Sequence, residues 1–267
     1  MIRPGVWLLK FRRLKLRVFE VAGQLAFISD IHANRPALEA VLEDIDRRKV
    51  AGIYNLGDSL FGPLDPDGTF ELLVSRNITH ICGNGDRDLL APDDGSESTL
   101  NRQRRVLSSA QRSWIASLPG RIDEDDVTAF HGAPDSDEVY LLESLTAEGV
   151  SRKSVEEVVG LLAGIEAEVV VCGHSHLPSV LRLPDRRLVI NAGSVGLPAY
   201  HDDWPVAHKM ESGTPHAKYA LVEKTKGRWQ VEIVMVPYNW RKAADLALAN
   251  GRPDWAEYLL TGLALGV

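Results

Sequence analysis

The chain has 267 residues, 45% of them hydrophobic and 25% charged, and its formal net charge is −7. This length and hydrophobic content suffice for one large core, so we expect residues 1–267 to form a single domain. The negative charge gives no general basis for attracting nucleic acid. No apolar run approaches the ~18 residues that a membrane span needs. Composition therefore argues against nucleic-acid-binding and membrane-embedded proteins.

The cysteines and the N-terminal segment bear on the compartment. Cys82 and Cys172 are the only cysteines, and each ends an apolar run, which favours buried thiols in a reducing cytoplasm over a disulfide. Basic residues interrupt the apolar ones in residues 1–22, so the uninterrupted apolar stretch of a signal peptide is missing. Leu14–Val18 alternates apolar and basic residues. We expect residues 1–22 to add an edge strand or an upstream extension, rather than a basic interaction arm.

Five short apolar runs each end at a polar motif. Continuous runs of this kind are typical of strands that are buried on both faces. In chain order, the runs and their motifs are residues 25–28 with Asp30-Ile31-His32, residues 53–56 with Gly57-Asp58, residues 78–82 with Gly83-Asn84-Gly85-Asp86, residues 127–130 with His131-Gly132, and residues 169–172 with Gly173-His174-Ser175-His176.

Helical patterns lie between several of these runs. The expected helices are residues 36–49, 102–117, 151–164 (beginning at Ser151), 240–249 and 253–263, and the expected hairpin joins residues 219–223 and 230–236 around Lys226-Gly227. Alternating strands and helices predict an α/β sheet whose motifs emerge together at the carboxyl ends of strands. Catalytic and binding groups usually lie on such loops.

The motifs together supply a set of metal ligands, although each is weak evidence alone. The set comprises Asp30, Asp58, Asn84, His32, His131, His174 and His176. It suits two transition-metal ions that share a bridging carboxylate, and this mixed ligation favours Mn, Fe, Zn, Co or Ni over Ca or Mg. Two divalent ions with two carboxylates leave a net charge of about +2, which would attract a phosphate ester, and metal binding can lower the pKa of water to about 7.

The chain resembles the calcineurin-like metallophosphoesterases, in particular their small prokaryotic phosphodiesterase-like branch. The resemblance rests on the motifs above and on Asn191-Ala192-Gly193-Ser194, and it runs from about Leu25 to the end of the chain. It implies a four-layer α-β-β-α sandwich of two mixed β-sheets flanked by helices. It also implies one ion held by Asp30, His32, Asp58 and His176, and a second held by Asp58, Asn84, His131 and His174, with Asp58 as the bridge.

One position departs from the family pattern. The family commonly has a histidine after the motif asparagine, which is thought to assist the leaving group, and this chain has Gly85 there. Every metal ligand is retained, so the departure leaves only the general acid unidentified. Arg87 offers two interpretations: a bidentate donor to the phosphate, or an ion-pair partner of Asp86 or Asp88.

The other histidines and one glycine-rich loop are interpreted more simply. His80 lies inside a strand run and is expected to be a core histidine. His201, His208 and His216 occupy one polar stretch and are expected on the surface, with one of them at the rim of the site as the alternative. The loop of residues 191–196 lacks the lysine and spacing of a P-loop, so we expect it to pack tightly beside the metal centre.

We therefore predict a dinuclear-metal-dependent phosphoesterase that hydrolyses phosphodiesters or phosphomonoesters by attack of a metal-bound hydroxide. Asp58, Asn84 and Arg87 are the predicted catalytic residues, and the resemblance slightly favours diesters. One alternative is a protein phosphatase, which would need a wide, shallow groove. Another is a non-catalytic metal-binding interaction scaffold, which the retention of every ligand disfavours. The physiological substrate and the oligomeric state do not follow from the sequence.

Overall fold

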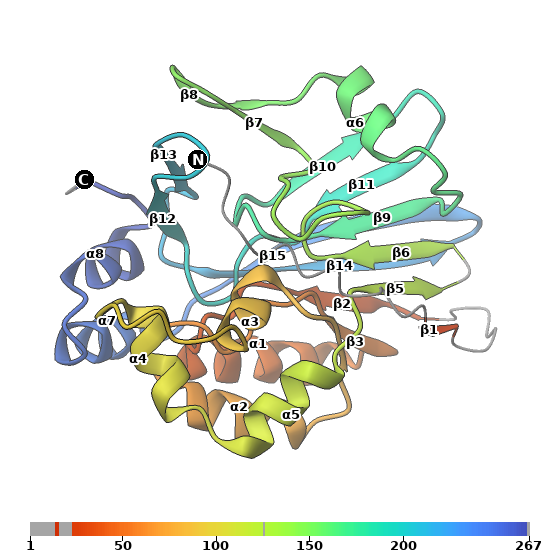
Figure 1. Cartoon of the computed structure of the whole chain (residues 1–267). Coiled ribbons are helices and arrows are strands. Elements are labelled where there is room, and N and C mark those ends of the chain that lie inside the picture. The colour runs from red at the N-terminus through yellow and green to blue at the C-terminus, as the bar shows by residue number, and fades with distance from the viewer. Residues whose placement is uncertain (1–13, 16–22, 125, 266–267) are drawn as a thin grey trace.

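The computed structural model describes residues 14–15, 23–124 and 126–265. Two mixed β-sheets pack face to face with helices outside them, which confirms the predicted four-layer sandwich (Figure 1). The six-stranded sheet has the order β1-β5-β6-β9-β11-β10, formed by β1 (Leu14–Lys15), β5 (Arg121–Glu124), β6 (Val127–Phe130), β9 (Val169–Cys172), β10 (Ser179–Arg182) and β11 (Leu188–Asn191). The five-stranded sheet has the order β15-β14-β2-β3-β4, formed by β2 (Leu25–Ile28), β3 (Gly52–Asn55), β4 (Thr79–His80), β14 (Ala217–Thr225) and β15 (Arg228–Val236).

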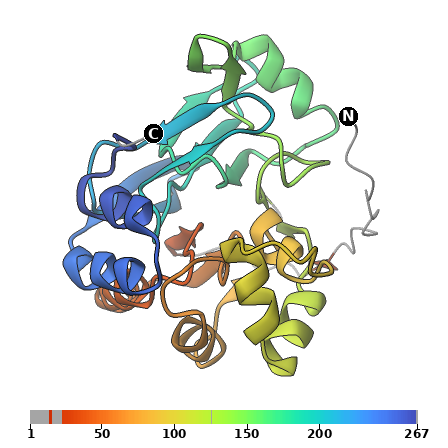
Figure 2. The same cartoon turned by 60° about the vertical axis from the view of Figure 1, so that its left-hand side comes forward.

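Two further hairpins lie outside these sheets. They are β7 (Glu143–Thr146) with β8 (Gly149–Arg152), and β12 (Ala199–Asp202) with β13 (His208–Glu211), each antiparallel. The helices are α1 (Arg35–Arg48), α2 (Pro66–Val74), α3 (Asn84–Leu89), α4 (Thr99–Val106), α5 (Ser109–Ser117), α6 (Val155–Leu161), α7 (Trp240–Ala249) and α8 (Pro253–Thr261). Figure 2 shows α6 on one side of the sandwich, α1 to α5 on the other, and α7 beside α8 at one end.

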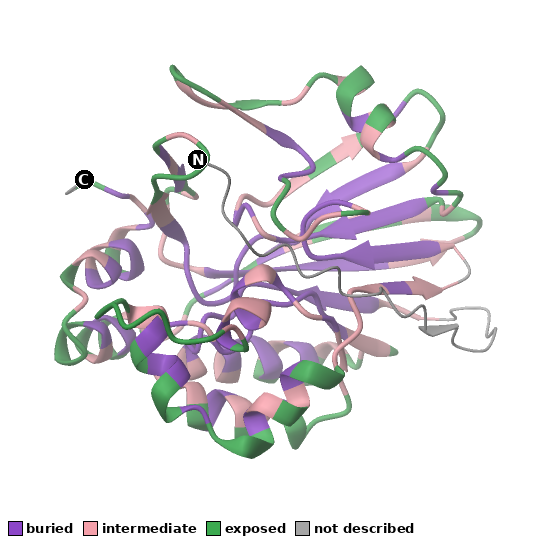
Figure 3. Cartoon of the chain, in the orientation of Figure 1, coloured by how far each residue is buried: buried purple, intermediate pink, exposed green. Residues whose placement is uncertain are grey.

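The core forms three apolar layers because the central strands bury both faces. Strands β2, β6, β9 and β11 are buried along their whole length (Figure 3), as the continuous apolar runs predict. Between the sheets, Phe27 stacks on Tyr54 with 5.0 Å between ring centroids, and both pack in one cluster with Val171 and Ile190. A second cluster joins the five-stranded sheet to α1, and a third joins the six-stranded sheet to α6. Each fully buried aliphatic side chain stabilises the fold by about 1.5–3 kcal/mol.

Two of the predicted helices are wrong in extent. Residues 102–117 do not form one helix, because Ser108 makes a capping box with Gln111 and starts α5 there. The helix predicted over residues 151–164 begins too early, because Ser151 pairs with Ser144 in the β7–β8 hairpin and Ser154 caps α6 instead. In both places a serine followed three residues later by Gln or Glu marks the true start.

The other predicted elements are present. The hairpin turns at Lys226 and Gly227, whose φ values of 51° and 72° are those of a tight two-residue turn. Strand β1 pairs in parallel with β5 at Leu14 and Lys15 and forms an edge of the six-stranded sheet, which is one of the two expectations for the N-terminal segment. The rest of that segment lies outside the described residues. Within the described residues, no helix is both long enough and apolar enough to cross a membrane.

Candidate metal centre

The topology brings the polar motifs together. Strands β2 and β3 are parallel neighbours in one sheet, and β6 and β9 are parallel neighbours in the other, so the loops that follow them emerge at the same edge of the sandwich. Two groups of predicted ligand atoms result, each within 4.8 Å of one another: Asp30, His32 and His176, and Asp30, Asp58 and His131.

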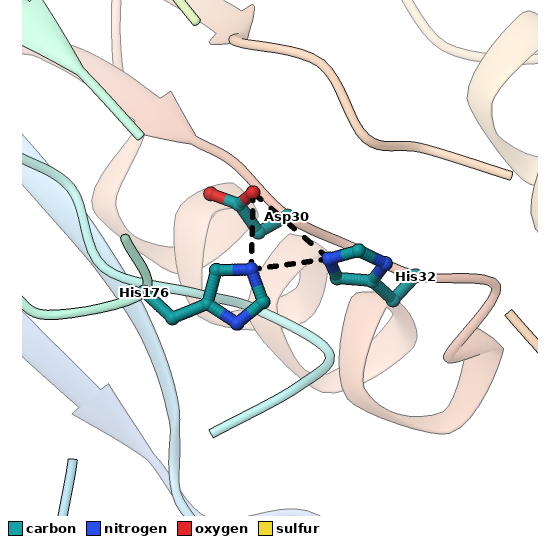
Figure 4. A group of neighbouring side chains, drawn as sticks. All are labelled: Asp30, His32 and His176. Carbon is teal, nitrogen blue, oxygen red and sulfur yellow. Dashed lines mark hydrogen bonds and ion pairs between the residues drawn. The ribbon is translucent and has the colours of Figure 1, made fainter. Parts of the chain in front are cut away.

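The first group is formed by Asp30, His32 and His176, whose side chains point at one another (Figure 4). The Nε2 atoms of His32 and His176 lie 3.1 Å apart. Oδ1 of Asp30 lies 3.3 Å from Nε2 of His176 and 4.0 Å from Nε2 of His32. All three side chains are buried, with at most 4% of each residue exposed.

Hydrogen bonds at the far side of each ring show which nitrogen faces the centre. Nδ1–H of His32 donates to the carbonyl of Phe61 at 2.9 Å, and Nδ1–H of His176 donates to that of Leu197 at 2.6 Å. In the neutral rings Nε2 then carries a lone pair and no proton. Two lone pairs and a carboxylate oxygen therefore face one another in a buried space, which costs free energy unless a cation lies among them.

Asp30 supports the same conclusion independently. Its Oδ2 accepts from the backbone N–H of His174 at 3.0 Å, whereas its buried Oδ1 has no hydrogen-bond partner among the described residues. A bare buried carboxylate oxygen is rare unless it binds an ion. Ligand atoms that share an ion lie about 3–3.5 Å apart because each metal bond is about 2.1 Å long. The 3.1 Å and 3.3 Å separations that involve His176 fall in this range, and the 4.0 Å separation between Asp30 Oδ1 and His32 Nε2 is wider.

The second group surrounds Asp58. Its Oδ1 lies 3.6 Å from Nε2 of His131, and its Oδ2 lies 3.8 Å from Nε2 of His32. His131 is fixed by an Nδ1–H bond to the carbonyl of Leu56 at 2.8 Å, and its Nε2 lies 2.9 Å from Oδ1 of Asn84. Each of the two Asp58 oxygens thus faces a predicted ligand of a different ion.

His174 lies beside this arrangement, outside both compact groups. Its ring centroid is 5.0 Å from that of His131 and 4.5 Å from that of Tyr140, on which it stacks. Its role as a ligand stays a prediction.

Burial and neighbouring charges both shift the pKa values of these side chains. Burial lowers the pKa of His32 to about 4 and that of His174 to about 3, with the neighbouring imidazoles adding to the effect. Burial also lowers the pKa of His131, but the carboxylates of Asp58 and Asp30 outweigh it and the net direction is upward. Burial raises the pKa of Asp30, and the surrounding histidines more than reverse this, so it stays ionised.

The backbone is left-handed at most of the predicted ligands. Asp30, His32, Asp58, His174 and His176 have φ values of 54°, 50°, 54°, 68° and 61°. A left-handed conformation costs a residue with a Cβ roughly 1–2 kcal/mol. Residues in such conformations cluster at functional sites, where the surrounding structure holds them in place.

Gly85 lies in the first turn of α3, directly against Asp58. Its N–H donates to Asp58 Oδ1 at 2.7 Å, and a Cβ added here would lie 3.1 Å from both Asp58 carboxylate oxygens and from Cβ of Phe61. The next residue but one, Arg87, bonds Asp137 through Nε (2.8 Å) and Nη2 (3.2 Å). Arg87 also pairs with Asp88 and Glu138, both at 2.9 Å. Of the two carboxylates that the sequence suggests as its partners, the structure pairs Arg87 with Asp88.

The glycine-rich loop packs where the sequence predicts. Ser194 Oγ donates to the carbonyl of Asp30 at 2.8 Å, and Gly196 N–H donates to the same oxygen at 2.9 Å. A Cβ at Gly196 would lie 1.7 Å from the carbonyl of Ile31, so only glycine allows this approach. The loop thus holds the backbone that carries Asp30.

The remaining histidines separate by environment. His80 bonds Asn55 at 3.2 Å and packs edge-on against Trp114, as expected of a core histidine. His201 and His216 are partly exposed. His208 is buried rather than on the surface, because its ring is enclosed by Tyr140 and Tyr200.

Three aromatic residues at the centre were missed by sequence reasoning. Tyr140 and Tyr200 contact the rings of His174 and His176, and Trp255 of α8 packs edge-on against His32 at 5.8 Å. None of the three belongs to a motif, so only the fold reveals their contacts with the predicted ligands.

Comparison with known proteins agrees with this fold. The model of the calcineurin-like phosphoesterase superfamily domain matches residues 24–212. The chain belongs to this superfamily, as the motif resemblance predicts.

Three relatives illustrate the similarity. An uncharacterized protein of Methanocaldococcus jannaschii is 28% identical over 261 residues, covering 88% of this chain and 96% of its own. The crystal structure of a metallophosphoesterase from Sphaerobacter thermophilus superimposes with a TM-score of 0.71 at 24% identity, over 90% of this chain and 99% of its own. The crystal structure of a hypothetical protein from Pyrococcus horikoshii superimposes with a TM-score of 0.69 at 18% identity, over 90% of this chain and 98% of its own.

Proposed function

We propose that the protein is a dinuclear-metal-dependent phosphoesterase whose ligands are Asp30, His32, Asp58, Asn84, His131, His174 and His176. The observation that carries the proposal is the set of electron-rich atoms around Asp30 Oδ1. Membership of the phosphoesterase superfamily supplies the reaction class. Imidazole, amide and carboxylate ligands favour Mn, Fe, Zn, Co or Ni.

The proposal gives defined roles to Asp58 and to the backbone carbonyls that hold the histidine rings. Asp58 joins the two halves of the site, because its two oxygens face His32 and His131 respectively. Backbone carbonyls hold the His32, His131 and His176 rings with Nε2 inward, and such outer hydrogen bonds fix the tautomer and raise ligand basicity. When bound, the two ions would supply Lewis-acid activation of water and of the phosphoryl oxygens.

The surroundings of Arg87 bear on substrate charge. Its guanidinium is already bonded to three carboxylates, so in our proposal Arg87 fixes α3 and the 137–138 loop, and the phosphate charge is met at the metal centre. A diester carries one negative charge less than a doubly ionised monoester. We therefore favour phosphodiesters as the substrate class.

Turnover of a substrate panel by metal-reconstituted protein tests the proposal. The panel should hold aryl and alkyl mono- and diesters, cyclic nucleotides and phosphopeptides, with metal content measured on the same samples. We expect two ions per chain and diester hydrolysis, and we expect Asp58→Asn to lose at least one ion and most activity. An exposed turn carboxylate provides the matched control, Asp185→Asn. A parent enzyme that binds no transition metal, or an Asp58→Asn variant that keeps two ions and its activity, would refute the assignment.

A further inference from the structure

A directional hydrogen-bond chain runs beside the metal centre. Nδ1–H of His208 donates to the carbonyl of Val206 at 2.8 Å, so Nε2 of the neutral ring is an acceptor. The hydroxyl of Tyr140, 3.0 Å away, donates to that Nε2. Because this commits the only Tyr140 proton, the hydroxyl of Tyr200 must donate in the 2.8 Å contact between the two tyrosines. The order is therefore Tyr200 to Tyr140 to His208.

The two tyrosines of this hydrogen-bond chain contact the rings of His174 and His176, which lie on the loop after β9. Tyr140 stacks on His174, with 4.5 Å between centroids and 25° between ring planes. Tyr200 meets His176 edge-on at 4.6 Å and 66°. The Tyr200 hydroxyl also donates to the backbone carbonyl of His174 at 3.3 Å, so its one proton is shared between this carbonyl and the Tyr140 oxygen. Each of these three contacts therefore involves a residue predicted to hold an ion.

The chain ties distant segments to this loop. His208 and Tyr200 come from the β13 and β12 strands of one hairpin, and Tyr140 precedes β7. His208 is 4% exposed and Tyr140 is 8% exposed, so their polar atoms depend on one another. His174 and His176 need such support, because both have left-handed backbone conformations that a free loop would relax.

We propose that His208, Tyr140 and Tyr200 act as positioning residues that hold the His174 and His176 rings in the orientation required at the metal centre. This inference rests on the proposed function only in naming the two histidines as ligands. The tyrosines contact the two imidazoles through their own rings, so the hydrogen-bonded chain acts by fixing where those tyrosine rings lie. Removing residues that orient a metal ligand commonly changes metal affinity or activity by about 10–100-fold.

A series of variants separates positioning from ordinary packing. Tyr140→Phe keeps the stacked ring and removes the hydroxyl, and His208→Leu removes the acceptor. His208→Gln restores an acceptor oxygen, so it is the conservative variant. The matched control is His216→Gln, because His216 bonds Thr214 and packs on Trp240 without touching a predicted ligand.

Three readouts apply to each folded variant: chelator competition for the bound metal, the visible spectrum of Co(II)-loaded protein, and the imidazole NMR signals of His174 and His176 in metal-free protein. We expect Tyr140→Phe and His208→Leu to weaken metal retention by about 10–100-fold, to alter the Co(II) spectrum and to shift both imidazole signals. The double variant should be no worse than either single variant, because both break one chain. His208→Gln should recover most of the loss, and His216→Gln should resemble the parent.

Opposite results have distinct meanings. Metal retention within two-fold of the parent and unshifted imidazole signals in folded His208→Leu would overturn the positioning role. Additive losses in the double variant would also overturn it, since the residues would then act separately. If the parent itself binds no metal, the proposed function fails, whereas the NMR signals of the metal-free variants still decide whether the chain orients the two rings.

Discussion

At the residue scale, Gly85 explains how closely α3 approaches the Asp58 carboxylate, the proposed bridge between the ions. The family's histidine cannot be introduced here without cost, since a Cβ would lie 3.1 Å from both Asp58 oxygens. The obstacle is contact rather than backbone conformation, because Gly85 is not among the residues with positive φ. The chain thus keeps a close N–H bond to Asp58 and lacks an imidazole beside the leaving group.

The missing imidazole predicts a strong dependence on the leaving group. Without an acid at this position, esters whose leaving groups are stable anions, such as nitrophenolates, should react much faster than alkyl esters, because general-acid help is typically worth about 10²–10⁴-fold. Gly85→His should narrow the gap by about 10-fold or more relative to Gly85→Ala, which adds the Cβ alone. Rates for an ester series measured under single-turnover conditions would check this. Equal rates across the series in the parent would reveal another acid.

At the element scale, Arg87 connects α3 to the loop between β6 and β7. Asn84 and Gly85 begin this short helix, and Asp137 and Glu138 lie on the loop. Because burial of the Arg87 head group is only partial, its ion pairs contribute moderately to stability and mainly fix where α3 lies.

Replacing Arg87 distinguishes the two interpretations that the sequence left open. We expect Arg87→Gln to lower the free energy of unfolding by about 1–3 kcal/mol, because three carboxylates lose their partner, and to change KM by less than about 3-fold. Arg105→Gln is the matched control, since that exposed arginine also pairs with two carboxylates, each pair being worth about 0.2–1 kcal/mol. Denaturation curves and steady-state kinetics give both quantities. A 10-fold or larger rise in KM with unchanged stability would instead make Arg87 a phosphate-binding residue.

Sequence reasoning succeeded where local pattern and structure coincide. Buried strands and their terminal motifs are local, so β2, β3, β6 and β9 could be located and their ligands expected at one edge. It failed where a cap interrupts a helical pattern, as at Ser108 and Ser154. It could not find Tyr140 or Tyr200 as neighbours of the centre, and it placed His208 there only as the alternative to a surface position, because long-range packing of two hairpins brings these residues together.

At the scale of the whole molecule, the proposed metal centre joins the two sheets. Asp30 and Asp58 follow strands of the five-stranded sheet, whereas His131 and His176 follow strands of the six-stranded one. Bound ions would therefore cross-link the layers at one edge and stabilise the whole fold.

Chelation should consequently lower the melting temperature. An ion present at 100 times its Kd stabilises the folded state by about 2.7 kcal/mol, and for a chain of this size we expect a fall of about 5–10 °C for each ion removed. Calorimetry with and without chelator measures it. His131→Ala is the control, because a variant that holds fewer ions should lose less on chelation. An unchanged melting temperature in protein shown to have lost two ions would contradict the cross-link.

Half-buried His80 adds an acid sensitivity that is independent of the metals. Burial lowers its pKa from 6.5 to about 4, so between these values the unfolded chain binds a proton that the folded chain does not. Its contribution to stability is complete above about pH 6.5 and is lost as the pH falls towards 4. Lowering the pH from 7 to 4.5 should reduce the urea midpoint of metal-free protein, and this reduction should be smaller in His80→Gln than in the parent. Identical pH profiles would exclude this contribution.

The left-handed backbone at Asp30, His32, Asp58, His174 and His176 sets thermodynamic stability against activity in this chain. Glycine would relieve the steric cost at each of these positions and would remove a ligand at the same time. If these residues hold ions as proposed, selection for activity preserves the left-handed backbone at these positions, and selection for thermal resistance alone acts against it. A lineage that abandoned the reaction would then be expected to change these loops before its core changed.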